Sequence, residues 1–154
     1  MTSKQNKTAL QKATELLANQ EQSSAILRRK LLARKYSPPE VDEAIAKLQK
    51  YNYLDDEDAC RRQFENFYSE GKLSVRQIAV KLLQRGFDKN FIERLIPDDV
   101  EEHELQAAEK LLAKKFPRGE IDRAKAWQFL SARGFDGEII SSAVEKFSSP
   151  TFEI

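Results

Sequence analysis

The chain has 154 residues, of which one third are charged and 40% are hydrophobic, and its formal net charge is +1. This composition supplies enough apolar material for a folded core and differs from that of a disordered chain. No segment approaches the roughly 18 apolar residues that a membrane span needs, and the N-terminal residues lack the apolar stretch of a signal peptide. The lone Cys60 cannot form an intrachain disulfide, so we expect a reducing, cytoplasmic setting.

The sequence offers little material for catalysis or metal binding. It has one histidine, one cysteine and five glycines, and the glycines form no phosphate-binding loop. Two acidic clusters, at 55–58 and 98–102, lack the glycine turn of a calcium site, and we expect their carboxylates to cap helix N-termini. We interpret Cys60 as a half-buried structural residue and His103, among glutamates, as a surface residue with a modestly raised pKa. The sequence thus predicts a protein that is not an enzyme and holds no cofactor or metal.

A threefold internal repeat is the most informative feature of the chain. Segment Arg85–Asp88, Arg-Gly-Phe-Asp, recurs unchanged as Arg133–Asp136, and Arg34–Ser37 holds the same place 51 residues before the first copy. Apolar positions and helix-capping residues recur at the same offsets from these three segments. They include Leu31, Leu82 and Leu130, and Ser23, Ser74 and Asp122. Repeats of this size with matching apolar positions indicate stacked supersecondary units.

Each unit is predicted to contain three helices. In chain order, the first unit has helices at about 8–19, from Ser23 to near Lys35, and from Ser37 onward. The second has helices at about 56–70, from Ser74 to near Gly86, and from Asp88; the third has helices at about 100–115, from Asp122 to near Gly134, and from Asp136. Apolar residues at i, i+4 and i+7 favour helices over strands. The predicted fold is all-α, an elongated tandem array of three three-helix repeats at 8–52, 53–97 and 98–148.

The residues at the expected helix ends support this division. Ser74 and Gln77 form a capping-box pattern, and the run Ser37–Glu40, Ser-Pro-Pro-Glu, is a strong helix start. Gly86 and Gly134 fall where a left-handed residue stops a helix, since glycine tolerates that conformation at low cost. Lys35 holds the equivalent place in the first unit, where the same geometry should cost free energy.

Basic residues on the middle helices are the best candidates for a binding site. A helical projection places three of them opposite the apolar face of the first middle helix, and the later units keep some of these positions. The candidate contacts are Arg29, Lys30, Arg34, Lys81, Arg85 and Arg133. Lys30–Arg34 and Lys81–Arg85 are like-charge i, i+4 pairs, each of which costs roughly 0.2–0.5 kcal/mol in an isolated helix. Repetition of a mildly destabilising pair suggests an anionic partner such as phosphate, and the alternative is a solubilising surface with acids nearby.

Charge and aromatic residues are distributed unevenly. Residues 1–50 carry ten Lys and Arg against five Asp and Glu, whereas residues 98–154 carry eight against twelve. Trp127, Phe129 and Phe135 could stack on nucleic-acid bases, although most aromatic residues at helical spacing belong to a core. Trp127 is the least secure core assignment, because the other units have arginine and alanine at its position.

Four segments of the chain, in order, carry a family resemblance. They are Ser24–Leu31 (with Leu-Arg-Arg-Lys-Leu), Tyr53–Asp56 (Tyr-Leu-Asp-Asp), Leu82–Phe87, and Ala126–Phe135 (with Ala-Trp-Gln-Phe-Leu). Over about residues 9–147 the chain resembles the bacterial regulatory protein RecX family. The resemblance implies tandem three-helix repeats that bind the RecA recombinase along the groove of its filament on single-stranded DNA. It further implies inhibition of the ATPase, strand-exchange and coprotease activities of RecA during DNA repair and recombination.

Other functions stay open at this point. Three-helix units can resemble helix-turn-helix domains, and a nucleic-acid-binding module acting without RecA would bind bare DNA with a steep salt dependence. We expect weak contact with single-stranded DNA instead, because residues 98–154 are acidic. An enzyme is disfavoured because no base, nucleophile and orienting group can be assembled. We also expect a monomer, since no heptad seam predicts a coiled-coil dimer.

Overall fold

The computed structural model describes residues 7–148, and within that range the regular secondary structure is entirely α-helical. The helices are α1 Ala9–Asn19, α2 Ser24–Ala33, α3 Pro38–Lys50, α4 Asp56–Glu70, α5 Val75–Gln84, α6 Lys89–Leu95, α7 Glu101–Lys115, α8 Arg123–Ala132 and α9 Gly137–Ser148. The predicted all-α repeat fold is confirmed. None of the helices in this range is both long and apolar enough to cross a membrane.

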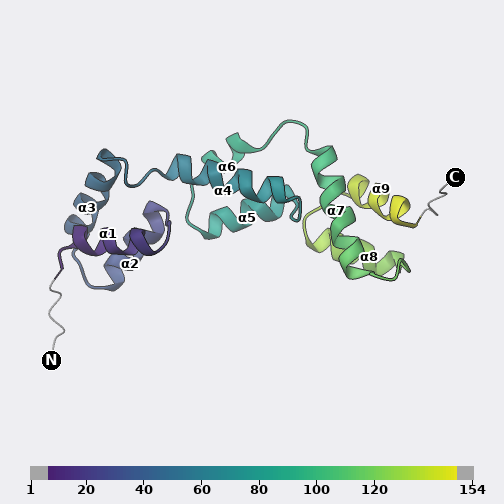
Figure 1. The fold of residues 1–154 in the computed structure, drawn as a ribbon, viewed down its shortest axis with the longest axis horizontal. Coiled ribbons are helices and arrows are strands. Elements are labelled where there is room, and N and C mark those ends of the chain that lie inside the picture. Colours follow the sequence, from purple (N-terminus) through teal and green to yellow (C-terminus); the bar gives the residue numbers. More distant parts are fainter. Residues whose placement is uncertain (1–6, 149–154) are drawn as a thin grey trace, which may run out of the picture.

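The helices pack in three consecutive triplets that follow one another along the long axis of the molecule (Figure 1). Each triplet has a separate hydrophobic core, so no single core holds the molecule together. The fully buried residues Leu31, Leu82 and Leu130, which the repeat aligned, each lie in one of the three cores. The middle helices α2, α5 and α8 all lie along the lower edge of the view in Figure 1.

The capping residues that the sequence predicted begin the middle helices. Ser23, Ser74 and Asp122 each accept a hydrogen bond from the backbone N–H three residues later. Gly86 and Gly134 are left-handed, with φ of 86° and 84°. Lys35 adopts the same conformation, with φ of 69°, so the first unit keeps the geometry without a glycine.

The serine caps also join one unit to the next. The Ser23 hydroxyl donates to the carbonyl oxygen of Arg85 at 2.6 Å while it accepts from the backbone N–H of Ile26. The Ser74 hydroxyl repeats this arrangement and donates to the carbonyl oxygen of Arg133 at 2.5 Å. Because Arg85 and Arg133 are the C-caps of α5 and α8, the N-terminus of α2 meets the C-terminus of α5, and the N-terminus of α5 meets the C-terminus of α8. Each junction thereby pairs backbone groups that two helix ends would leave unsatisfied.

These junctions explain why the three repeats differ at their helix ends. A β-carbon on Gly86 would lie 2.5 Å from the Ser23 hydroxyl oxygen, and one on Gly134 would lie 2.7 Å from Cδ of Arg76. Lys35 belongs to the first of the three described units, and it lines a hollow formed by described residues of that unit alone. Asp122 belongs to the last unit, where the cap has only to accept a hydrogen bond. Glycine and serine therefore occur where two units meet.

At each junction, a carboxylate of the later unit accepts a hydrogen bond from the backbone at the start of the earlier unit's middle helix. Asp56, in the first turn of α4, accepts from the backbone N–H of Ser24 at 2.8 Å and also pairs with the Ser24 hydroxyl. Glu104 of α7 accepts from the backbone N–H of Val75 at 3.1 Å. The expectation that the acidic clusters cap their own helices is confirmed for Asp55, which accepts from the Asp58 N–H. Asp56 instead caps the helix of the neighbouring unit.

His103 lies at the second junction, and its assignment as a surface residue was wrong. Its side chain is 7% exposed and its ring stacks on Tyr68, with the ring centroids 4.0 Å apart and the planes 8° from parallel. Neither ring nitrogen has a hydrogen-bond partner among the described residues, and a Glu104 carboxylate oxygen is 3.6 Å from Nδ1. Burial, with a smaller contribution from Lys110, lowers the His103 pKa against the opposing effect of the Tyr68 backbone. Burial also raises the pKa of Glu104, against the opposing effect of the Val75 N–H.

We predict that Gly86→Ala destabilises the fold more than Gly119→Ala does. Both glycines have positive φ, so each substitution carries a left-handed alanine penalty of about 1–2 kcal/mol. A β-carbon on Gly119 meets no atom within 4 Å, whereas one on Gly86 meets Ser23 and Ile26. Urea denaturation measures the unfolding free energy of each variant. The difference between the two losses is the cost of the overlap at the junction. Equal losses of unfolding free energy would contradict the close packing.

Exchanging the caps tests the two-way role of the serine hydroxyl. In Ser74→Asp the new carboxylate can still accept from Gln77, but it has no proton to donate to the Arg133 carbonyl. We expect a loss of roughly 1–3 kcal/mol in unfolding free energy, the cost of an unpaired buried polar group. Asp122→Ser should change stability by less, because the Asp122 side chain only accepts a hydrogen bond within the described part of the chain. Thermal melting of both variants measures the difference, and a larger loss in Asp122→Ser would argue against this role.

The buried histidine predicts a pH dependence of stability. Because its folded pKa lies below the unfolded value of about 6.5, the unfolded chain binds a proton more readily, and stability falls as pH falls through 6.5. His103→Phe keeps an aromatic ring on Tyr68 and removes this titration. We expect urea titrations between pH 7.5 and 5.5 to show a smaller loss of unfolding free energy in the variant. Parallel pH profiles for the two proteins would refute this role of the ring.

Candidate partner-contact surface

The candidate surface lies on the three middle helices, which we call the middle-helix row: α2, α5 and α8, joined end to end through the Ser23–Arg85 and Ser74–Arg133 hydrogen bonds. Each of these helices has ten residues. At 1.5 Å per residue, three such helices give a row about 45 Å long. All six candidate residues lie on these helices or at their C-caps.

The first junction brings Lys30 and Arg85 together from two different units. Both line a hollow of about 430 Å³, whose floor includes Ser23 and Ile26. Four glutamine side chains, at positions 20, 22, 63 and 84, also line it, so the hollow is rich in hydrogen-bonding groups. Lys30 is half-buried there, while Arg29 and Arg34 are exposed on the same helix. The repeat alone places Lys30 and Arg85 at different positions of their units and did not predict that they share a hollow.

In the second unit, Phe67 of α4 holds the basic pair of α5. The Arg85 guanidinium carbon lies 4.9 Å from the Phe67 ring centroid, and the Lys81 ammonium nitrogen lies 6.0 Å from it. Arg85 also donates from Nη1 to Oε1 of Gln63 at 2.7 Å. An aromatic face attracts cations by roughly 0.5–1 kcal/mol at exposed sites, which offsets the repulsion within the like-charge pair.

The third unit repeats this arrangement with different residues. The Arg133 guanidinium carbon lies 3.7 Å from the Phe129 ring centroid, and its Nη1 donates to the Phe129 carbonyl oxygen at 3.2 Å. Lys115 of α7 approaches the same ring, at 5.6 Å. The Lys81 position is thus taken by the aromatic residue, and a lysine from another helix supplies the second cation. No pattern in the sequence marks Phe67, Gln63 or Lys115 as part of a cation site, because these residues lie outside the middle helices.

The candidate cations are not neutralised by acids of the chain itself. Within residues 7–148, none of Arg29, Lys30, Arg34, Lys81, Arg85 and Arg133 forms an ion pair with a carboxylate. Three other arginines do form such pairs: Arg28 with Asp42, and Arg61 and Arg62 with Asp58. Within the same range, no ion pair is formed by Arg76, Arg94, Arg118 and Arg123 either. One acid lies near two of these cations, since Glu21 lines the same hollow as Lys30 and Arg85, but it pairs with Arg62. Their charge remains available to a partner.

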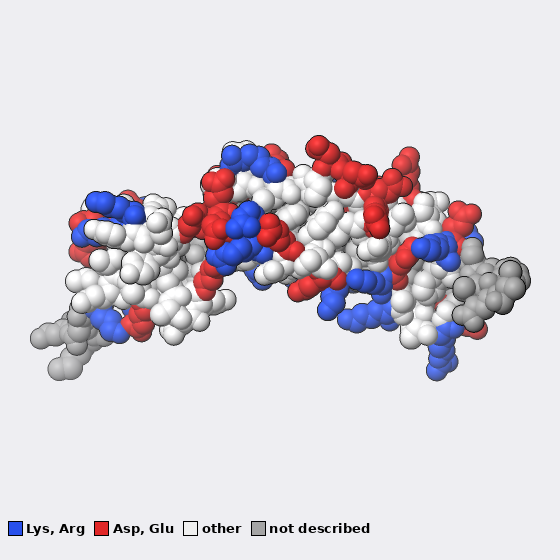
Figure 2. Space-filling view, turned by 45° about the horizontal axis from the view of Figure 1, so that its top comes forward, with Lys and Arg blue, Asp and Glu red and all other residues white. Residues whose placement is uncertain are grey.

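Acidic side chains gather on another side of the molecule. Figure 2 shows red side chains along the upper edge of the right-hand half, and the α6–α7 connection lies on the upper edge of Figure 1, away from α5 and α8. Asp98, Asp99, Glu101 and Glu102 are all exposed in this stretch. Over α4 the basic and acidic side chains of Figure 2 are intermingled, in agreement with the ion pairs there. The middle-helix row thus faces away from the main acidic stretch.

Two further side chains bear on the alternatives that the sequence left open. Cys60 is wholly buried in the second core. Burial, with a contribution from Asp56, raises the pKa of its thiol. The neighbouring Arg61 and Arg62 pair with carboxylates. Trp127 is 41% exposed, which agrees with its insecure core assignment, whereas Phe135 is buried. No group of three His, Cys, Asp or Glu residues within 7–148 is arranged to hold a metal ion.

Comparisons with known proteins agree with this architecture. Family models described as the first and third three-helix domains of RecX match residues 9–48 and 101–144. A regulatory protein RecX of Actinobacillus pleuropneumoniae is 30% identical over 145 residues, which cover 91% of this chain and 93% of that protein. One of Deinococcus radiodurans is 34% identical over 127 residues, 80% of this chain and 60% of the relative.

Solved structures show the same fold. A crystal structure of RecX from Lactobacillus salivarius has a TM-score of 0.71 at 20% identity and covers 90% of this chain and 94% of that chain. A second crystal structure of a regulatory protein RecX has a TM-score of 0.75 at 19% identity and covers 89% of this chain and 70% of that chain. By its match to the Actinobacillus pleuropneumoniae protein, which covers nearly the whole length of both chains, the chain belongs to the RecX family of regulatory proteins.

Proposed function

We propose that this protein is a non-enzymatic regulator that binds the RecA filament on single-stranded DNA and inhibits its ATPase, strand-exchange and coprotease activities. The family supports the regulatory role, and the middle-helix row supports this mode of binding. The observation that carries the proposal is the set of six cations along that row, none of which forms an ion pair with a carboxylate among residues 7–148. We place the three repeats at 8–52, 53–97 and 98–148, so that each contributes one helix to the contact.

The dimensions of the row fit an extended partner. A standard protein interface buries about 800 Å² on each side, which is a patch roughly 28 Å across if it is circular. The row is about 45 Å long, because it contains three ten-residue helices in series. It can therefore contact more than one protomer of a repeating polymer. Binding across protomers would couple them and oppose the rearrangements that accompany ATP turnover and filament growth.

The charge distribution sets the orientation of the bound protein. Lys30 and Arg85 present cations at the first junction, and Arg133 presents one in the third unit. These side chains suit acidic side chains of RecA or phosphates of the DNA strand that it holds. The exposed acids of the α6–α7 connection would be repelled by the same partner, so they favour one face over the other. We expect weak binding to bare DNA, because only part of this row would meet phosphate.

We predict that Lys30→Glu/Arg34→Glu abolishes inhibition of the DNA-dependent ATPase of RecA. Arg34 is exposed and Lys30 half-buried, so helicity and melting temperature should change little. A matched control, Lys72→Glu/Lys114→Glu, makes the same change in net charge at exposed residues outside the middle helices and should still inhibit. ATP hydrolysis by RecA on single-stranded DNA, titrated with each protein, measures the effect. Undiminished inhibition by the folded double variant would reject the site.

The same titration separates this proposal from binding to nucleic acid alone. A regulator of RecA lowers the ATPase rate at substoichiometric amounts, while it binds bare single-stranded DNA weakly. A module acting without RecA would instead bind bare DNA tightly, with affinity falling steeply as salt increases. Tight DNA binding with no effect on the ATPase beyond competition for the strand would overturn the proposed function.

A further inference from the structure

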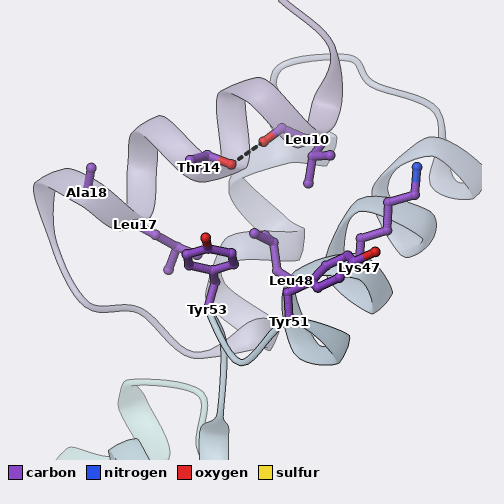
Figure 3. A pocket seen from close by; sticks show the side chains of 8 residues that line it. All are labelled: Leu10, Thr14, Leu17, Ala18, Lys47, Leu48, Tyr51 and Tyr53. Carbon is purple, nitrogen blue, oxygen red and sulfur yellow. Dashed lines mark hydrogen bonds between the residues drawn. The ribbon is translucent and has the colours of Figure 1, made fainter.

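A second surface, which we call the α1–α3 groove, lies on the first unit and uses no residue of the middle-helix row. It is a hollow of about 590 Å³ lined by Leu10, Thr14, Leu17, Ala18, Lys47, Leu48, Tyr51 and Tyr53. As Figure 3 shows, the Tyr53 ring lies between Leu17 and Leu48, and the Tyr51 ring lies beside Lys47. The lining is largely apolar and contains no carboxylate.

The two tyrosines have no structural role that accounts for their placement. Tyr51 is 64% exposed and Tyr53 is 74% exposed, the largest values among the big apolar side chains of the described chain. Neither hydroxyl makes a hydrogen bond to another residue that the structure describes. In contrast, the next residues each stabilise the fold, since Leu54 is buried, Asp55 caps α4 and Asp56 joins the first two units.

The backbone holds both rings in place over the groove. Asn52 between them is left-handed, with φ of 61°. The N–H of Asn52 donates to the Gln49 carbonyl at 3.1 Å, and that of Tyr53 donates to the Leu48 carbonyl at 2.9 Å. A hydrogen-bonded turn therefore presents the rings to solvent. Because the turn is already ordered, less conformational entropy is lost when a partner binds.

The shape of the groove fits an amphipathic helix. On α1 its lining residues follow i, i+4, i+7 and i+8 from Leu10 to Ala18, a stripe about 12 Å long at 1.5 Å per residue. That is about two turns of a partner helix, which would place apolar side chains at i, i+3 or i+4, and i+7. A concave floor of leucine and alanine accommodates such side chains, whereas nucleobases stack on open aromatic faces.

Charge at the rim specifies the partner further. Lys47 lines the groove, and its ammonium nitrogen forms an ion pair with a Glu43 carboxylate oxygen at 3.4 Å. The Lys50 ammonium nitrogen lies 5.7 Å from the Tyr51 ring centroid. Lys50 forms no ion pair with a described carboxylate. A segment whose apolar side chains are flanked by Asp or Glu complements this rim.

We propose that the α1–α3 groove binds a short amphipathic, acidic helix of the RecA protomer, as an anchor separate from the middle-helix row. This inference rests on the proposed function and adds a second contact to it. Tyrosines are frequent energetic centres of protein interfaces, because they bury a large area at a small entropic cost.

The test measures binding of the labelled protein to RecA assembled on single-stranded DNA, by fluorescence anisotropy. Tyr51→Ala/Tyr53→Ala should weaken binding at least tenfold with an unchanged melting temperature, whereas Tyr51→Phe/Tyr53→Phe should bind like the original chain. Ala18→Trp should block the groove. Ala46→Trp is its matched control, because Ala46 is exposed on α3 outside the groove lining. Binding of the double alanine variant within twofold of the original would overturn the proposal.

A photo-crosslinker identifies the occupant directly. With Tyr53→p-benzoylphenylalanine, we expect a crosslink to a RecA segment that contains apolar and acidic residues, located by mass spectrometry. A crosslink to DNA, a crosslink to a second copy of this chain, or intact filament binding without any crosslink would each overturn the inference while leaving the proposed function standing. Failure of the unmodified chain to bind the filament would overturn both this inference and the proposed function.

Discussion

The serine hydroxyl at each junction is the interaction on which the arrangement of the molecule depends. Ser23 and Ser74 accept from their own helix and donate to the C-cap carbonyl of the next middle helix. Backbone groups at helix ends must find partners when they are buried, and one small hydroxyl supplies both an acceptor and a donor. Each unit has its own core, so the geometry of these contacts, together with Asp56 and Glu104, sets how the units line up.

The same requirement accounts for the imperfect repetition of the chain. The turn that precedes each third helix is left-handed in all three units, but only the second and third press that turn against another unit. Glycine is needed there because a β-carbon would overlap the neighbour, whereas Lys35 lines a hollow formed by described residues of its own unit. Asp122 replaces serine where no donor is required. Differences between repeats thus mark the faces at which two described units meet.

The middle-helix row and the α1–α3 groove suit different kinds of contact. The row carries cations held by aromatic rings, Phe67 beneath Arg85 and Phe129 beneath Arg133, so its charges are positioned without being neutralised. The groove carries exposed tyrosines over an apolar floor. Electrostatic contacts steer association and select the face that binds, whereas buried apolar contacts contribute most of the lasting affinity. A protein using both can find an extended partner quickly and remain bound.

The sequence by itself determined the helices, their caps, the threefold repetition and the outward face of the basic residues, because these follow from local periodicity and from hydrogen bonds within a few residues. Only the tertiary structure decided which residues meet across units. In the folded protein, Lys30 and Arg85 line the same hollow, and Asp56 accepts a hydrogen bond from the N-terminus of α2 in the preceding unit. His103 is buried against Tyr68. Local pattern predicted a surface histidine because its neighbours in sequence are acidic, but its neighbours in space belong to another helix. Contacts between units depend on the relative placement of separate cores, which no periodicity within a single unit encodes.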